Sequence, residues 1–351
     1  MDMPGSNIWI SLPSISGKES DNWFLKAIST RAIRSRSQQN FSLLEVITMP
    51  NEVFESQVAL LVRVLPHVGT ETCFALKGGT AINLFVRDLP RLSVDIDLVY
   101  LPIEDRETSL IGIRSALVRI AQKIRKAIPG SAVTDSANAV GTLVLVRQRN
   151  AQIKIEVTPV LRGTVHPTEL KTVRPIVEGP FGFAEIQVVS FADLYAGKLV
   201  AALDRQHPRD LFDVQHLLAN EGIDRTLYQT FLAYILSHNR PAHELLQPRL
   251  KDIRQAFERE FVGMTVSETS LVMLLAARER LVAEIHSRLD KTSKLFLKSF
   301  HAFRPDWDLI SSPTIRNLPA IRWKLMNLQR LQTENPEKYQ AMLQELDAVL
   351  S

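Results

Sequence analysis

A single cysteine, Cys73, occurs among the 351 residues. One thiol cannot form an intramolecular disulfide, and it excludes a zinc site built from several cysteines. No window approaches the roughly 20 apolar residues of a membrane span. The N-terminus (MDMPGSNIWISLPS) also lacks the basic and apolar regions of a secretory signal. We therefore expect a cytoplasmic protein with no membrane contact and no disulfide partner.

Internal repeats and low-complexity blocks are absent as well. The sequence is 45% hydrophobic and 23% charged, which excludes collagen-like and disordered classes. Lys and Arg (42) exceed Asp and Glu (38) by four, and the pI is about 9.2. A pI above about 9 points toward a nucleic-acid partner, although a mildly basic soluble protein accounts for this value equally well.

Hydrophobic periodicity divides the chain near residue 190. Helices are predicted over residues 53–68, 78–85 and 103–128, and strands over 73–76, 95–101, 142–146, 152–157 and 186–189. The Pro- and Gly-rich residues 175–182 are interpreted as a connecting loop. Every periodic segment after Ser190 is helical. The expected organisation is an N-terminal arm (1–50), an α/β domain (51–190) and a helical domain (191–351).

The first chemical motif is Lys77-Gly78-Gly79-Thr80, between a predicted strand and a predicted helix. Two glycines let backbone N–H groups approach a phosphate closely, and a helix start favours negative charge. Thr80 would cap the helix or contact the phosphate. The alternative is a simple tight turn.

The second motif is a set of acids on two strands. Asp95 and Asp97 alternate with Ile96 and Leu98, so both carboxylates lie on one strand face, about 6.5–7 Å apart. Such a pair favours a divalent cation such as Mg²⁺. Glu156, in the alternating stretch IKIEV, becomes a third carboxylate if its strand lies alongside. The alternatives are a solvated edge strand for the aspartates and a cross-strand ion pair for Glu156.

The third motif lies in the helical part. Lys198 and Arg205 share one helix face with small residues between them, which leaves room for an anion such as a triphosphate. Asp210 and Asp213 follow at i, i+3 spacing. A surface cluster of salt bridges is the alternative.

Four segments carry these motifs in a fixed order: KGGTAINLF, RLSVDIDLVY, KIEV and KLVAALDRQHPRDLFDV. Over roughly residues 74–218 they resemble the nucleotidyltransferase fold of DNA polymerase beta-like enzymes. The fuller pattern resembles the AbiEii family of toxin nucleotidyltransferases, which includes the MenT-type toxins. The resemblance implies an α/β (α+β) fold: a mixed sheet with flanking helices, followed by an all-helical C-terminal half.

The resemblance also implies roles for individual residues. Ser93 would lie beside the reacting phosphate and is open to modification. Either Asp213 or Asp210 is the functional acid, and Asp210 would otherwise pair with Arg205 or Arg209. Thr80 stands where the fold usually has serine and keeps the hydroxyl. The implied catalytic residues are Asp95, Asp97, Lys198, Asp213 and Glu156; the implied nucleotide-binding residues are Lys77, Gly78, Gly79, Thr80, Ser93, Arg205 and Asp210; the implied metal ligands are Asp95, Asp97 and Glu156.

The implied reaction is nucleotide transfer from an NTP, pyrimidine and preferably CTP, to the 3′ acceptor end of tRNA. It would use two Mg²⁺ ions, with Mn²⁺ as a substitute. The implied partners are the NTP, the tRNA acceptor stem and a cognate AbiEi-type antitoxin. A protein or small-molecule hydroxyl as acceptor, or a non-catalytic nucleotide-binding protein, are the alternatives. Basic residues outside the motifs fit an RNA partner or a solvated surface: Arg114, Arg119, Lys123, Arg125, Lys126, Arg278, Arg280, Arg288, Lys291, Lys294 and Lys298.

Overall fold

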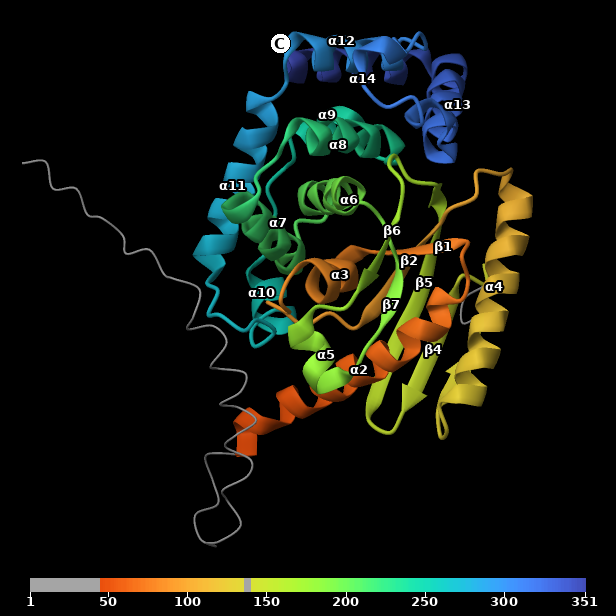
Figure 1. The fold of residues 1–351 in the computed structure, drawn as a ribbon. Helices are drawn as coiled ribbons and strands as arrows, with labels where there is room; N and C mark the ends of the chain where they lie inside the picture. The colour runs from red at the N-terminus through yellow and green to blue at the C-terminus, as the bar shows by residue number, and fades with distance from the viewer. Residues whose placement is uncertain (1–44, 136–139) are drawn as a thin grey trace, which may run out of the picture. The chain divides into compact units, whose positions relative to one another are not determined.

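A computed structural model describes residues 45–135 and 140–351 (Figure 1). The residues from Pro50 to Ser351 form one compact unit. The predicted arm over residues 1–50 therefore lies outside the described residues, apart from the start of helix α2.

Within the described residues, seven strands form one mixed sheet in the order β3-β4-β5-β2-β1-β7-β6. The strands are β1 (Phe74–Lys77), β2 (Asp95–Tyr100), β3 (Ala132–Thr134), β4 (Leu143–Gln148), β5 (Ala151–Arg162), β6 (Glu169–Thr172) and β7 (Glu185–Val188). The β2–β5 and β1–β7 pairs are parallel, whereas the remaining pairs are antiparallel.

Helices precede, connect and follow the strands. They are α2 (Glu45–Gly69), α3 (Gly78–Ala81), the π-helical turn η2 (Ile82–Val86), α4 (Arg106–Ala127), α5 (Pro175–Phe181), α6 (Phe191–Asp204), α7 (Pro208–Asn220), α8 (Arg225–Ser237), α9 (Ala242–Leu246), α10 (Arg254–Glu260), α11 (Leu271–Ser287), α12 (Lys291–His301), the 3₁₀ turns η3 (Trp307–Leu309) and η4 (Ile315–Asn317), α13 (Pro319–Glu334) and α14 (Pro336–Leu350). None of these described helices is long and apolar enough to cross a membrane.

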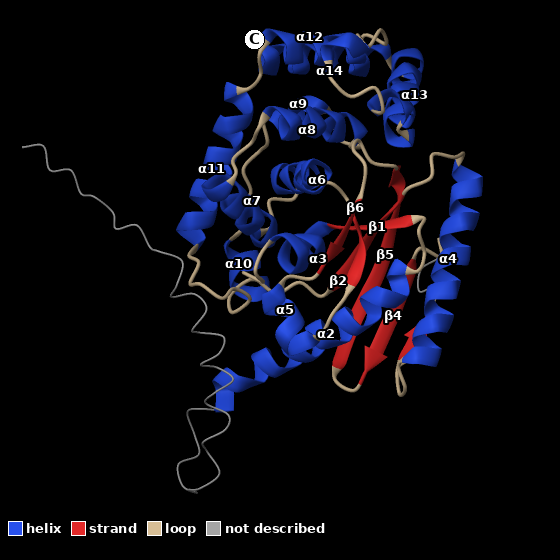
Figure 2. Cartoon of the chain, viewed as in Figure 1, coloured by secondary structure: helices blue, strands red, loops and turns tan. Residues whose placement is uncertain are grey.

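Helices cover both faces of the sheet (Figure 2). Helix α4 packs on β3, β4 and β5, and α3 packs on β1 and β2 from the other side. Helix α6 contacts α3, α7 and α8, so it connects the sheet layer to the helical half. The expected α/β fold, a mixed sheet followed by helices to the C-terminus, is confirmed.

Local signals explain where the longest connecting helix begins and ends. The Asp105 carboxylate accepts the Thr108 N–H at 2.9 Å and caps α4. The helix stops before Pro129 and Gly130, because a proline cannot continue the hydrogen-bond ladder. Buried side chains from Ile113 to Ile124 recur on one face and pack on the sheet.

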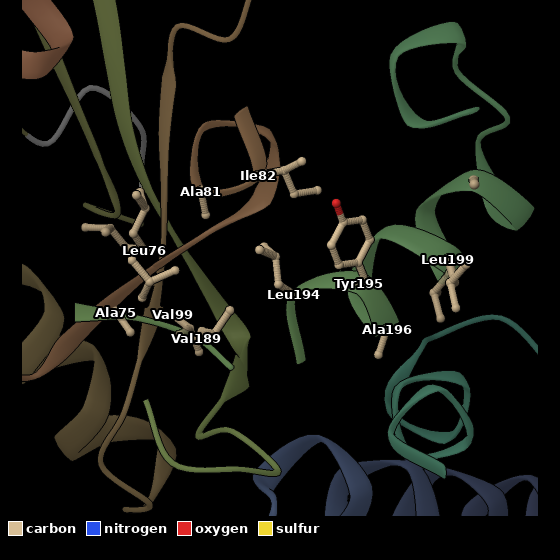
Figure 3. Close-up of a cluster of buried hydrophobic side chains, with 14 of the residues drawn as sticks. Ala75, Leu76, Ala81, Ile82, Val99, Val189, Leu194, Tyr195, Ala196 and Leu199 are labelled. Atoms are coloured by element: carbon tan, nitrogen blue, oxygen red, sulfur yellow. The ribbon is translucent and has the colours of Figure 1, made fainter. Parts of the chain in front are cut away.

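The core continues across the layers near β1 (Figure 3). Leu76 of β1, Ile82 of η2, and Leu194 and Tyr195 of α6 are nearly or fully buried together. The Tyr195 hydroxyl oxygen accepts the Nε–H of Arg87 at 3.1 Å, so the one polar atom of this ring is also satisfied. Burial of each large apolar side chain contributes about 1.5–3 kcal/mol to folding.

The structure corrects one expectation and adds two strands. Residues 175–182 are not a loop, because Pro175–Phe181 form helix α5. Proline suits the first turn of a helix, where its missing N–H is not needed, and Val177 anchors the helix in the core. Strands β3 and β6 are short and mostly exposed at the two sheet edges, so they lack the apolar alternation that would predict them.

We predict that Leu76→Ala lowers the free energy of unfolding by about 2–5 kcal/mol, because it leaves a cavity beneath a central strand. Leu170→Ala on edge strand β6, where the side chain is 59% exposed, should change it by less than about 0.5 kcal/mol. Urea denaturation measures both values. Equal losses for the two variants would contradict the placement of the core.

Candidate active site

Acidic side chains from two neighbouring strands share one face of the sheet. Parallel pairing of β2 with β5 places Asp95 opposite Lys154 and Asp97 opposite Glu156. Paired residues in a ladder point to the same side, so the three carboxylates and Lys154 lie on one face of the sheet. Ile96, opposite Ile155, lies on the apolar face.

Electrostatics distinguish these carboxylates. Burial raises the pKa of Asp95, the positive charge of Lys154 opposes this shift, and the neighbouring Asp97 and Glu156 raise the pKa further. The Glu156 carboxylate lies 2.8 Å from the Lys154 ammonium, and both side chains remain partly exposed. The cross-strand ion pair named as an alternative is replaced by a pair along β5 itself.

Asp95 and Asp97 fit a hard divalent cation by their chemistry. Both supply carboxylate oxygens, the ligands that Mg²⁺ prefers, and their mutual repulsion is relieved by a cation. Among the residues that the structure describes, no three His, Cys, Asp or Glu side chains gather as a ready-made metal site. The predicted role of Glu156 as a third ligand therefore stays a prediction.

The glycine turn lies directly against this acidic face. Lys77 at the end of β1 pairs with Asp97, and Gly78 follows with a φ of +74°. A Cβ at Gly78 would lie only 2.6 Å from the Asp97 Oδ2, and a Cβ at Gly79 would lie 2.8 Å from the Ser93 Oγ. Both positions need glycine because no side chain fits between the turn and the strand.

Thr80 turns inward instead of capping the helix. Its hydroxyl donates to the Asp95 carbonyl at 2.5 Å and lies 3.0 Å from the Ser93 hydroxyl, and the residue is fully buried. Asn83, also fully buried, donates from Nδ2 to the Gly79 carbonyl at 2.7 Å. These bonds fix the turn against β2, and they give the Thr80 hydroxyl a structural partner.

The helical motif forms a buried network of ion pairs. The Lys198 ammonium lies 2.7 Å from Asp210 and 3.0 Å from Asp213. Arg205 donates to both oxygens of Asp210 at 2.5 and 3.0 Å, so Arg205 rather than Arg209 is the partner that the sequence predicted. Arg91 donates to both oxygens of Asp213 at 2.7 and 2.6 Å. The network alternates in charge from Arg91 through Asp213, Lys198 and Asp210 to Arg205.

This pairing holds both aspartates in the charged form. Burial alone would raise the pKa of each carboxyl. Arg91 and Lys198 bring the pKa of Asp213 below its usual value, and Lys198 and Arg205 do so for Asp210. The Lys198 side chain is only 6% exposed, whereas that of Arg205 is 63% exposed. Of the two cations predicted to bind a triphosphate, Arg205 is the accessible one.

The sequence motifs gave Arg91 no role, and they named Arg209 only as a possible partner of Asp210. Arg91 is 3% exposed and its Nη2 lies 2.7 Å from the Cβ position of Gly79. Arg209, on the first turn of α7, lowers the pKa of Asp95 by its positive charge. The only sequence signal for Arg91 is its position two residues before Ser93. A basic residue between Pro90 and Leu92 is also typical of an exposed loop, so this position does not indicate a buried side chain.

Several basic residues expected on an RNA-binding surface have internal partners. Arg119 and Lys123 of α4 both pair with Glu71. Arg278 is buried and donates to the Gln206 side chain and the Lys251 carbonyl. These three side chains hold helices and loops together.

A sheet that carries a glycine turn beside an acidic strand, completed by cations from following helices, defines a protein of the nucleotidyltransferase class. The chain belongs to the AbiEii family: the model described as nucleotidyl transferase AbiEii toxin, type IV TA system, matches residues 59–327. The family is one of toxin–antitoxin systems, so an antitoxin partner is implied. The chain is thus a nucleotidyltransferase toxin by family.

A solved structure supports the fold. The chain is similar to MenT4, a nucleotidyltransferase toxin from Mycobacterium tuberculosis H37Rv, with a TM-score of 0.54 and 17% sequence identity. The match covers 81% of this chain and 98% of the MenT4 chain. No curated protein matches the sequence significantly.

Gly78 and Gly130 allow a matched test of the glycine turn. Both have a φ of +74°, but a Cβ at Gly130 meets nothing within 4 Å. We predict that Gly130→Ala costs about 1 kcal/mol of stability from backbone strain alone, whereas Gly78→Ala costs about 2 kcal/mol or more because the Asp97 carboxylate must move. Thermal and urea unfolding measure the difference. Equal losses would show that Asp97 does not pack on Gly78.

Proposed function

We propose that this protein transfers a nucleotide, preferably from CTP, to the 3′ acceptor end of tRNA in a metal-dependent reaction. The observation that carries the proposal is the placement of Asp95 and Asp97 on one sheet face, with Asp97 against the Gly78 turn. Family membership adds the reaction class. A net charge of +4 suits a polyanionic acceptor such as tRNA.

Asp95 and Asp97 would hold Mg²⁺, and Glu156 lies beside Asp97 at the edge of that group. When bound, the metal supplies charge stabilisation of the attacking and leaving oxygens. The residues around it then have distinct tasks in binding the NTP and the acceptor.

The glycine turn and Arg205 would bind the nucleotide phosphates. Backbone N–H groups of this turn would donate to the phosphate oxygens. The guanidinium of Arg205 is exposed, and its hydrogen bond with Asp210 and, to a smaller degree, the charge of Asp97 raise its pKa. Arg205 would stabilise the negative charge of the leaving pyrophosphate. The buried Lys198 would hold Asp210 and Asp213 in place.

Glu156 is suited to accept the proton of the attacking hydroxyl. Its side chain is 43% exposed, and Lys154 fixes the carboxylate beside Asp97. A proton acceptor at Glu156 Oε1, the carboxylate oxygen not paired with Lys154, would make the acceptor hydroxyl a stronger nucleophile. The antitoxin partner implied by the family would be of the AbiEi type.

The acceptor is tested by incubating the protein with total tRNA, Mg²⁺ and each labelled NTP in turn. We predict label on tRNA, strongest with CTP, and a loss of about 100-fold or more for Asp95→Asn, because a metal ligand is removed. Asp347→Asn, an exposed acid of α14 paired with Lys298, is the control and should keep full activity. Absence of label on tRNA with every NTP would reject tRNA as the acceptor. Label on a protein or small molecule would identify the alternative acceptor class.

Metal dependence has its own test. Treatment with a chelator should abolish transfer, and added Mg²⁺ or Mn²⁺ should restore it, because two adjacent carboxylates otherwise repel the phosphates. Transfer rates across a metal titration measure the effect. Full activity in excess chelator would overturn the assignment of Asp95 and Asp97 to a metal.

A further inference from the structure

We propose that Arg91 is a positioning residue for nucleotide transfer, which fixes the glycine turn and Ser93 relative to the Asp213–Lys198 pair. The inference rests on the proposed function for its activity readout. It concerns a residue that connects two parts of the site that are distant in sequence.

The Arg91 side chain is held rigidly. Its Nε and Nη2 donate to the two oxygens of Asp213 on α7, and its Nη1 donates to the Leu92 carbonyl at 2.9 Å. Asp213 is nearly fully buried as well. A planar guanidinium with three fixed hydrogen bonds has one orientation, which a lysine ammonium at the same place would lack.

The Arg91 backbone is held by the helical half too. Arg91 forms an isolated antiparallel bridge with Thr265, in the loop between α10 and α11. The Leu92 N–H donates to the Met264 carbonyl at 2.9 Å, and the Val266 N–H donates to the Pro90 carbonyl at 3.0 Å. Side chain and backbone therefore tie residues 90–92 to helices that follow more than 100 residues later.

The same residue touches the catalytic face. Its Nη2 lies 2.7 Å from where a Cβ of Gly79 would stand, beside the Ser93 hydroxyl. Ser93 leads through Val94 into Asp95, and Thr80 connects Ser93 and the Asp95 carbonyl to the glycine turn. A shift of the guanidinium would move the turn against the strand that carries both aspartates.

Charge gives Arg91 a second effect. The network contains three cations and two carboxylates, so it carries one net positive charge. Without Arg91, Lys198 is the only cation of the network on Asp213, and the network becomes neutral. Affinity for a triphosphate depends on this charge, whereas the rate of transfer depends on the orientation of the turn.

Two substitutions separate charge from orientation. Arg91→Lys keeps the charge, so the dissociation constant for CTP with Mg²⁺ should stay within about threefold of wild type, while kcat should fall about 10- to 100-fold because the turn is misplaced. Arg91→Met removes both, so nucleotide affinity should also fall, by about tenfold. Calorimetry gives the affinity and tRNA labelling gives kcat and KM.

Arg87→Lys is the matched control. Arg87 makes a comparable two-bond contact with Glu221 at the end of α7, but it has no contact with the glycine turn among those described for Gly78 and Gly79. This variant should lose thermal stability with kcat unchanged. An equal fall in kcat for Arg87→Lys and Arg91→Lys would show a general structural effect and overturn the proposal.

A double-mutant cycle tests whether Arg91 acts through Asp213. Arg91→Met combined with Asp213→Asn should lower kcat no more than the worse single variant, because the two act as one unit. Multiplied effects would overturn the proposal, as would a wild-type kcat in Arg91→Lys. If Arg91→Met does not fold, Arg91→Lys retains the test because it keeps a buried cation.

If wild type transfers nucleotide to no acceptor, the proposed function fails, and the nucleotide affinities of the Arg91 variants still show whether the charge acts as described.

Discussion

The buried pair of Arg91 and Asp213 is the interaction on which the rest of the site depends. Its partners are 122 residues apart, one before β2 and one on α7. Charges removed from water cost several kcal/mol each unless they are paired and hydrogen-bonded, and the loss of one partner costs about 3–5 kcal/mol. Few other arrangements of the chain would pair all of these buried charges. Pairing them brings the helices onto the acidic face of the sheet.

The sheet supplies the complementary constraint. Its apolar face is filled by α4 and by Ile96 and Ile155, so a slip of β2 by one residue would turn isoleucine toward solvent and aspartate into the core. The register that keeps Asp95 and Asp97 together is thus set by the residues between them. The same register of β2 therefore stabilises the core and places the two carboxylates.

Local patterns in the sequence predicted most of the sheet and the acidic face, because the alternation of apolar and polar residues in a strand depends only on residues adjacent in the sequence. They offered salt bridges among Lys198, Asp210 and Asp213 only as a surface alternative, whereas the structure buries these pairs. Helix spacing says which residues share a face and not what packs there. Arg91 was missed for the same reason: its partner lies on another element far along the chain. Helix α5 and the edge strands β3 and β6, with seven, three and four residues, are too short for periodicity to detect.

Burial also changes the meaning of the net charge. Among the described residues, five cations are buried (Arg91, Arg162, Lys198, Arg278 and Lys324) against four carboxylates (Glu71, Asp193, Asp210 and Asp213). Residues 45–351 contain 37 Lys and Arg and 35 Asp and Glu, so they carry two of the four net positive charges of the chain. The interior accounts for one of these two. Internal ion pairs involve many lysines and arginines, but they involve nearly as many carboxylates, so they change the net charge little. A polyanionic acceptor responds to the charges at the surface, whereas the buried cations act on the reaction through the carboxylates that they fix.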